Sequence, residues 1–167
     1  MKYFVVIDMQ NDFCTGALKN SAAVAIIPRI KEELDKAREE GCKIIYTRDT
    51  HYDNYLKTGE GKHLPVTHCI RYTDGWEIVN ELAPKENDTI INKEHFGFDK
   101  WTDYIKPNSE VTMVGTCTDT CVVSNALAIK QIEGVEVKVI ADACAGLSPE
   151  THKSALDVMK CCQCSIV

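Results

Sequence analysis

The chain has 167 residues, of which 44% are hydrophobic and 26% charged, and its formal net charge at neutral pH is −6. This composition is typical of one globular domain and excludes a disordered chain or a fibrous repeat. The acidic balance disfavours nucleic acid or an anionic membrane surface as a partner. No apolar run reaches the roughly 20 residues that cross a bilayer. The apolar N-terminal segment already ends at Asp8, too early for a secretory signal, so we expect a cytoplasmic protein.

Nine cysteines are many for this length. An odd number of cysteines without an export signal argues against a disulfide framework. Cys161, Cys162 and Cys164 lie close together, but they have neither CxxC spacing nor a nearby histidine. We expect them to be small buried side chains around a terminal strand.

In chain order, the hydrophobic pattern predicts a strand at 2–8, a helix at 21–40 and a strand at 43–49. Ser21 is the expected N-cap of that helix, Gly41 follows its end, and Pro28 indicates a kink or a restart inside it. Residues 50–74 are polar and hold three of the five histidines. A loop of this length in a compact domain is usually functional or disordered.

The second half continues with a short helix at 75–82, a strand at 88–92 and a helix at 98–105. A strand at 110–115, a helix at 119–133, a strand at 136–142, a helix at 149–160 and a strand at 164–167 complete the chain. Alternating strands and helices predict right-handed βαβ units and a parallel sheet covered on both faces. Ligands of such α/β folds bind beyond the carboxyl ends of the strands.

Three side chains that can act together in catalysis, an acid, an amine and a thiol, lie at or after those strand ends. Asp8 ends the first strand and Lys93 the third, while the stretch TCTDTC brings Cys121 from the fourth strand to the start of a helix. A helix N-terminus and an ammonium group both stabilise a thiolate. A carboxylate can take the thiol proton and return it to a leaving amine, and N–H groups between 116 and 121 are candidates for an oxyanion hole. Each residue has an ordinary structural interpretation as well, and spacing alone leaves both open.

A second group of candidates surrounds the long polar stretch. Asp49 and His51 form an Asp-x-His pair at the end of a strand, where alternate residues project to the same side. With Glu60 and His68 they provide two imidazoles and two carboxylates, a set that suits zinc, iron or manganese better than calcium. Histidines and acids scattered in a loop are often not ligands, and His63 and Asp53 compete for the same role.

Five stretches of the chain together resemble the isochorismatase-like cysteine hydrolases, and within that family the nicotinamidases. They are VIDMQNDF (6–13), YTRDTH (46–51), LPVTHC (64–69), NKEHFGF (92–98) and GTCTDTCV (115–122). The resemblance runs from Tyr3 to about Ser148. It implies a single domain over 1–167, with a six-stranded, mostly parallel sheet of Rossmann-like order in a three-layer α/β/α sandwich.

The resemblance also assigns roles in catalysis. It implies a catalytic triad of Asp8, Lys93 and Cys121, with Cys121 as the nucleophile because this cysteine precedes Val122 in the family motif. The backbone amides of Cys117 and Cys121 would form the oxyanion hole. A cis peptide bond that does not involve proline is expected at Thr116–Cys117.

For the nicotinamidase branch, the resemblance implies a divalent metal beside the triad, with zinc expected and iron(II) or manganese(II) as alternatives. Asp49, His51 and His68 match its ligands. The third ligand is His or Glu in this family: Lys57 fills the usual histidine position, Glu60 fits the glutamate variant, and His63 is the reserve candidate. The metal would bind the pyridine nitrogen of nicotinamide and so orient the carboxamide over the nucleophile.

Two residues are expected to contact the substrate. Phe13 matches an aromatic residue that packs on the substrate ring in this family. Leu64 stands where an aromatic residue often precedes the proline, and the loop before His68 is one residue longer. We therefore expect a wider or differently shaped ring pocket.

The sequence thus predicts a metal-containing cysteine amidase that converts nicotinamide to nicotinate and ammonia through a thioester, in NAD salvage. One alternative is an amidase or ureidohydrolase of the same family that acts on another small carboxamide or carbamoyl compound. Another is a non-catalytic binding protein on the same fold. Isochorismate hydrolysis is disfavoured because that reaction does not need the thiol. The expected partner is a small molecule, and homo-oligomers are possible.

Overall fold

The computed structural model describes residues 1–167. Its six strands are β1 (Lys2–Ile7), β2 (Lys43–Asp49), β3 (Thr89–Lys93), β4 (Glu110–Thr116), β5 (Glu136–Ala145) and β6 (Ser165–Ile166). They form one sheet in the order β3-β2-β1-β4-β5-β6, and every neighbouring pair is parallel. The prediction of a six-stranded parallel sheet is confirmed.

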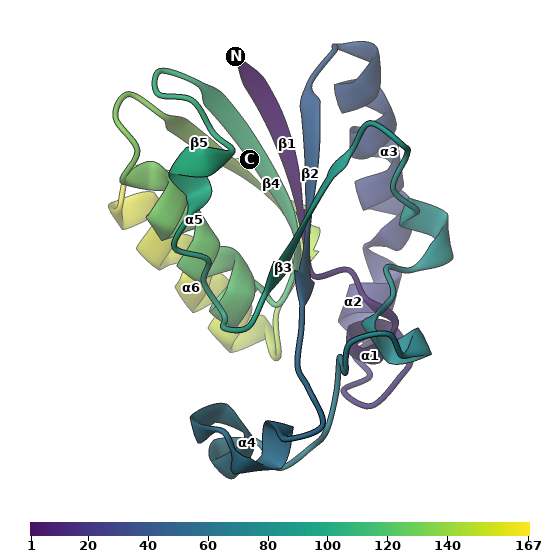
Figure 1. Ribbon diagram of the computed structural model, residues 1–167. Coiled ribbons are helices and arrows are strands. Elements are labelled where there is room, and N and C mark those ends of the chain that lie inside the picture. Colours follow the sequence, from purple (N-terminus) through teal and green to yellow (C-terminus); the bar gives the residue numbers. More distant parts are fainter.

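Helices cover both faces of this sheet (Figure 1). The longer helices on one side are α2 (Ser21–Ala25) and α3 (Ile27–Glu39), and those on the other side are α5 (Val123–Lys130) and α6 (Pro149–Cys161). The buried core is accordingly divided: Ile30 and Leu34 of α3 pack on one face of the sheet, and Ile129 and Met159 of α5 and α6 pack on the other. These are the three layers that the sequence predicts.

The predicted helix at 21–40 consists of two helices, and Pro28 lies in the first turn of the second. A proline at this position costs no hydrogen bond, because the first N–H groups of a helix have no partner within it. The N-cap is Asn20 and not Ser21, since the Asn20 side chain accepts a hydrogen bond of 2.9 Å from the backbone N–H of Ala22. Gly41 follows the end of α3 with a φ of +73°, as expected.

Two predicted helices are wrong. The segments 75–82 and 98–105 contain only single 3₁₀ turns, at Asp74–Trp76, Asn80–Leu82 and Trp101–Asp103. Their apolar side chains recur at helical spacing because separate turns insert Trp76, Leu82 and Trp101 into the core. Spacing of apolar residues does not distinguish a helix from a coil with regularly spaced buried anchors.

Other boundaries differ less. The predicted helix at 119–133 is a π-helical turn at Thr118–Val122 followed by α5, which ends at Lys130. The loop at 50–74 contains a 3₁₀ turn at Tyr55–Lys57 and the short helix α4 (Gly59–His63), and a further short helix, α1 (Asn11–Cys14), was not predicted. In Figure 1 the segment with α4 lies beyond the carboxyl ends of the strands.

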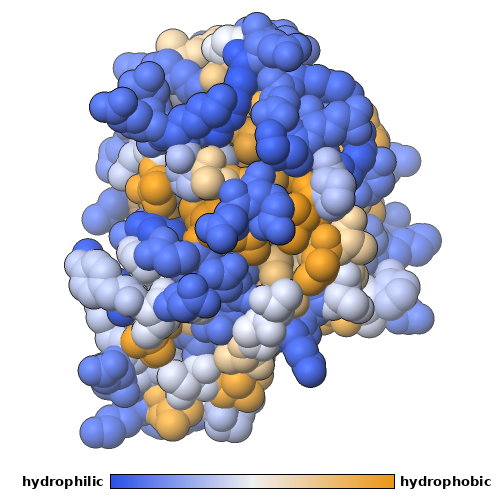
Figure 2. All heavy atoms as spheres, turned by 90° about the vertical axis from the view of Figure 1, so that its right-hand side faces the viewer, coloured by the Kyte–Doolittle hydropathy of each residue, from blue (hydrophilic) through white to orange (hydrophobic).

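The interpretation of the C-terminal cysteines is correct only for Cys164, which is buried. Cys161 and Cys162 are exposed; they are the last residue and the C-cap of α6. No helix of the chain is long and apolar enough to cross a membrane. The face that carries α3 is mainly hydrophilic, with hydrophobic side chains gathered near its middle (Figure 2).

The backbone at the ends of β1 and β4 is unusually close. Gly115 has a φ of +127°, and a side chain there would collide with the backbone of Ile7. Glycine is therefore required at this position. Asp8 follows with a φ of +48°, a conformation that aspartate tolerates better than most residues. This close approach brings the end of β1 beside the turn that carries Cys121.

Candidate active site

The structure brings Asp8, Lys93 and Cys121 together at the carboxyl ends of the strands, and all three are buried. The Lys93 ammonium lies 2.7 Å from Asp8 Oδ2 and 3.7 Å from Cys121 Sγ. Asp8 directly follows β1, Lys93 is the last residue of β3, and Cys121 lies in the π-helical turn after β4. An acid, an amine and a thiol therefore meet as the strand ends predicted.

Further hydrogen bonds hold the acid and the amine. Thr47 Oγ1 donates to Asp8 Oδ1 at 2.6 Å and accepts from the backbone N–H of Asp8 at 3.2 Å. Lys93 Nζ donates to the carbonyl of His95 at 3.0 Å. Because each group is fixed by more than one partner, the ion pair has a defined position next to the sulfur.

Burial sets the protonation states. It raises the pKa of the Cys121 thiol well above the usual range, more than Lys93 lowers it. Burial also raises the pKa of Asp8, helped by the nearby charge of Asp49 and opposed by Lys93. Burial alone would lower the pKa of Lys93, but the surrounding acidic groups raise it. The resting site therefore holds a neutral thiol and a charged amine, beside a carboxyl group whose raised affinity for a proton suits a base. The sequence predicts that a carboxylate takes the thiol proton and that the ammonium stabilises the resulting thiolate, and in the structure burial opposes that stabilisation.

The turn before Cys121 offers backbone N–H groups. The peptide bond Thr116–Cys117 is cis, as the resemblance implies. The N–H of Cys117 donates to no protein group, while its carbonyl accepts from the N–H of Val122 at 3.0 Å. A free N–H one turn from the sulfur can receive an oxyanion.

The four predicted metal ligands also lie together: one ligand atom from each of Asp49, His51, Glu60 and His68 lies within 4.8 Å of all the others. His51 Nε2 is 2.9 Å from Asp49 Oδ2, and His68 Nε2 is 3.5 Å from the same oxygen. Glu60 Oε1 lies 3.5 Å from His51 Nε2 and 3.9 Å from His68 Nε2.

The competing residues lie elsewhere. His63 is exposed, and its Nδ1 is 2.8 Å from the carbonyl of Gly59 in its own helix. Asp53 and Lys57 are exposed as well. Of the candidates for the remaining ligand, the structure places Glu60 in the cluster.

Neighbouring residues orient these ligands. His68 Nδ1 is 2.7 Å from the carbonyl of Val66, so that Nε2 faces the cluster. The ring of Tyr55 lies 4.5 Å from that of His51 and 5.0 Å from that of His68, measured between centroids. Tyr55 is a residue that sequence reasoning missed, because nothing but its place in the long loop distinguishes it.

Gln10 was also missed, although it belongs to the VIDMQNDF stretch. Its fully buried side chain donates to the carbonyl of Asp49 at 2.8 Å and accepts from the N–H of Asp49 at 2.7 Å. It therefore fixes the backbone at the first ligand. Its position three residues after the first strand, two after Asp8, was the only available signal.

Asp49 belongs to both groups. Its Oδ1 lies 3.4 Å from Lys93 Nζ, while Oδ2 faces the two histidines. Burial would raise the pKa of Asp49, but the Lys93 charge and the hydrogen bonds from His51 and His68 hold it well below the usual range. Asp49 is therefore ionised, and it links the ammonium to the cluster of ligands.

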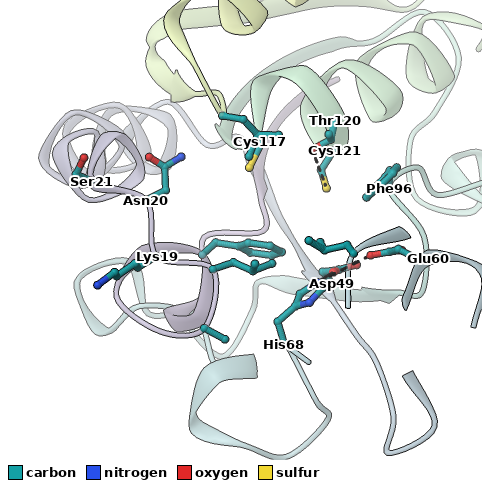
Figure 3. Close-up of a pocket in the computed structure, with 15 residues that line it drawn as sticks. Lys19, Asn20, Ser21, Asp49, Glu60, His68, Phe96, Cys117, Thr120 and Cys121 are labelled. Carbon is teal, nitrogen blue, oxygen red and sulfur yellow. Dashed lines mark hydrogen bonds and ion pairs between the residues drawn. The ribbon is translucent and has the colours of Figure 1, made fainter. Parts of the chain in front are cut away.

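A pocket of about 610 Å³ opens above these residues (Figure 3). Predicted residues that line it are Phe13, Asp49, Glu60, Leu64, His68, Cys117 and Cys121. Phe96 and Leu147, which sequence reasoning did not single out, add apolar surface. Asp8 and Lys93 lie behind Cys121 and do not line the pocket, so a ligand there meets the sulfur first.

Comparison with known proteins identifies the family. The family model described as the isochorismatase domain matches residues 2–167. The nicotinamidase/pyrazinamidase of Mycobacterium tuberculosis is 26% identical, over all of this chain and 98% of that protein. The ureidoacrylate amidohydrolase RutB of Agrobacterium fabrum is 26% identical, over 90% of this chain and 78% of that protein.

Among solved structures, the pyrazinamidase of Pyrococcus horikoshii in complex with zinc has a TM-score of 0.88 and 32% identity, over 99% of this chain and 98% of that one. Together with the sheet order and the buried thiol, these similarities define an amidohydrolase with a parallel α/β fold. The chain belongs to the isochorismatase family and is an amidase of that family.

Proposed function

We propose that this protein hydrolyses nicotinamide to nicotinate and ammonia, with Cys121 as nucleophile and Asp8 as proton acceptor and donor. One observation carries the proposal: the Asp8–Lys93–Cys121 group and the cluster of two histidines and two carboxylates meet at one pocket and share Asp49. The mycobacterial relative, named a nicotinamidase/pyrazinamidase, matches this chain over its whole length.

The first half of the reaction forms a thioester. As Cys121 Sγ attacks the carboxamide carbon, its proton passes to Asp8, and Lys93 stabilises the negative charge that develops on the sulfur. The backbone N–H groups of Cys117 and Cys121 receive the oxyanion. The C–N bond then breaks, and the nitrogen leaves as ammonia with the proton that Asp8 held.

The second half restores the enzyme. A water molecule gives a proton to Asp8 and attacks the thioester carbon. The C–S bond breaks, nicotinate forms, and the proton on Asp8 returns to the Cys121 sulfur. Since the pKa of Asp8 is raised, the carboxyl group can both take and return a proton.

The donor set fits a divalent metal ion. Two imidazoles and two carboxylates suit zinc, with iron(II) and manganese(II) as alternatives. Asp49, His51, Glu60 and His68 would hold the ion, which when bound would coordinate the pyridine nitrogen and align the ring. The zinc complex of the archaeal pyrazinamidase is consistent with this choice.

Phe13 and Leu64 are the proposed contacts of the ring. The Phe13 ring lies 5.7 Å from that of His68, so it flanks the space between the cluster and Cys121. Phe96 also lines the pocket. Aromatic walls stack on a flat ring and leave its carboxamide free to point at the sulfur. The product nicotinate would then enter NAD salvage, and self-association remains a prediction.

A second candidate substrate class is a small ureido or carbamoyl compound. It is favoured by the similarity to RutB and by the pocket volume of about 610 Å³, in which one pyridine ring leaves space unfilled. The same groups would cleave the C–N bond of such a compound. The mechanism is shared, and only the part of the pocket around the ring distinguishes the two.

The decisive experiment measures ammonia release from nicotinamide and from a panel of carbamoyl compounds, before and after chelation. We expect the highest kcat/KM for nicotinamide, a loss on chelation and recovery with zinc. A higher kcat/KM for a ureido compound would replace the substrate and keep the mechanism. Bound metal with no ammonia release from any amide would overturn the proposal in favour of a non-catalytic binding protein.

A further inference from the structure

Asn125 lies in α5, one helical turn after Cys121, and is completely buried. Its Nδ2 donates to the carbonyl of Cys121 at 2.8 Å and to the carbonyl of Phe96 at 2.9 Å. Its Oδ1 accepts from the N–H of Phe98 at 2.9 Å and from the indole N–H of Trp101 at 3.0 Å. A carboxamide has two donors and two good acceptor positions, and all four are used.

The segment that Asn125 binds has no backbone pairing of its own, although Phe98 packs against the core. Residues 94–99 follow β3 and take part in no backbone-to-backbone hydrogen bond. Two buried side chains hold their backbone: Asn125 binds residues 96 and 98, and Lys93 Nζ donates to the carbonyl of His95. A segment without its own hydrogen-bond ladder takes its position from such side chains.

This segment reaches the chemistry at two points. Phe96, whose side chain is 45% exposed, forms a wall of the pocket beside Cys121, on the side away from Cys117 (Figure 3). The carbonyl of His95 is a hydrogen-bond acceptor of the Lys93 ammonium. A shift of the segment would therefore move a pocket wall and loosen the amine next to the sulfur.

We propose that Asn125 is a positioning residue, which holds the Phe96 segment against the turn of Cys121 and so sets the shape of the pocket. The proposal rests on the function proposed for Cys121 and Lys93. Asn125 does not touch the substrate and acts through Phe96 and through the acceptor of Lys93. An asparagine with a purely structural role would stabilise α5 without affecting the position of Phe96 or the hydrogen bond of Lys93 to the His95 carbonyl.

The test uses two variants of the full chain. Asn125→Asp keeps the size of the side chain and both acceptor positions but loses the donors to Phe96 and Cys121, and Asn125→Ala removes all four hydrogen bonds. Asn11→Ala is the matched control, because Asn11 also bridges two segments through its carboxamide, with a 2.8 Å bond to the carbonyl of Asp74. The Tm of Asn11→Ala can be compared with the Tm of the Asn125 variants, and this control leaves the Phe96 segment undisturbed.

Two readouts distinguish positioning from stability. For both variants we expect KM for nicotinamide to rise by at least about fivefold, because the Phe96 segment loses the hydrogen bond that holds it beside Cys121. In a Phe96→Ala background the same change should alter KM by less than about twofold, because the wall is already absent. Alkylation of Cys121 by iodoacetamide, followed on its own peptide by mass spectrometry, should be faster than in the unmodified protein.

The alkylation rate needs no substrate, so it separates this proposal from the proposed function. If no amide is hydrolysed, faster alkylation of Cys121 still supports the positioning role. Unchanged KM and alkylation with only a lower Tm would overturn the proposal, as would a KM effect that persists in full without Phe96. If both variants fail to fold, Trp101→Phe removes one of the four hydrogen bonds, and it should change KM and alkylation in the same direction by about twofold; no change would count against the proposal.

Discussion

Asp8 directly follows β1, Lys93 ends β3 and Cys121 lies in the turn after β4. Among the four clustered ligands, only Asp49 lies in a strand. The other three ligands lie in the segment that leaves β2. Asp49 and Lys93 are paired in the register of β2 and β3, so the sheet itself fixes their separation. Among the loop ligands, His51 is held by a single isolated bridge to Ile70. The rings of His51 and His68 pack on that of Tyr55.

This difference separates two tasks. The half of the site built on the sheet holds its geometry through backbone ladders, which are stable and shared with the core. The half built on the loop brings its ligands together through one isolated bridge and a few side-chain contacts, which a metal ion can strengthen. We therefore expect changes in the sheet half to abolish chemistry and leave metal binding intact. Changes in the loop half should weaken metal and substrate binding and leave the sulfur unaltered.

The largest effect is expected from Cys121→Ala. Removing the nucleophile should lower kcat by at least about 10³-fold, because residues that act in one covalent step are not replaced by their neighbours. Metal content and Tm should stay close to those of the unmodified protein. The measurements are ammonia release, elemental analysis and thermal unfolding, with the buried Cys164→Ala as control. Near-normal turnover of Cys121→Ala would show that the nucleophile is assigned wrongly.

His51→Ala tests the other half. Loss of a ligand should weaken zinc binding by at least about 100-fold, since even the outer partners of ligands contribute 10–100-fold. KM should rise more than kcat falls, and the alkylation rate of Cys121 should be unchanged. Metal retained after dialysis is the measurement, and His152→Ala, outside the cluster, is the control. Unaltered zinc content would mean that the cluster does not hold the metal.

The same difference explains what could be predicted from the sequence. The strand-end residues were found because parallel strands bring their carboxyl ends to one edge, a rule that needs no detailed coordinates. The four ligands were candidates from their residue types and spacing, but this left His63 and Asp53 as competitors, and the family resemblance still kept His63 in reserve. The loop fold distinguishes Glu60 from His63: α4 turns Glu60 inward and His63 outward. Contacts such as those of Asn125 join residues 24 to 29 positions apart, and no local pattern reveals them.

The acid limb of the pH profile tests the sheet half more finely. Asp8 must be ionised to accept the thiol proton, and burial raises its pKa, so kcat/KM should fall with decreasing pH above the 3.8 of an ordinary aspartate. Thr47→Val removes the hydrogen bond that lowers the pKa of Asp8. Loss of a hydrogen bond worth about 1 kcal/mol should raise the pKa of Asp8 by a further amount of roughly 0.7 unit.

Measuring kcat/KM from pH 4 to 8 checks both statements, with Thr112→Val as a threonine control outside the site. If Thr47→Val does not shift the acid limb of the kcat/KM profile, a group other than Asp8 supplies the base. The shift is expected in kcat/KM, because this ratio reports the ionisation of the free enzyme.

The smallest effect concerns the choice between Glu60 and His63. Glu60→Gln should weaken zinc binding by about tenfold, less than His51→Ala, because the Glu60 side chain is partly open to water that can replace it as a ligand. His63→Gln should leave affinity unchanged, since His63 is exposed and its ring is turned to its own helix. Zinc titration of both variants against a competing chelator measures the difference. A loss confined to His63→Gln would mean that α4 rotates when metal binds, and the loop half would then be assembled by the ion rather than before it.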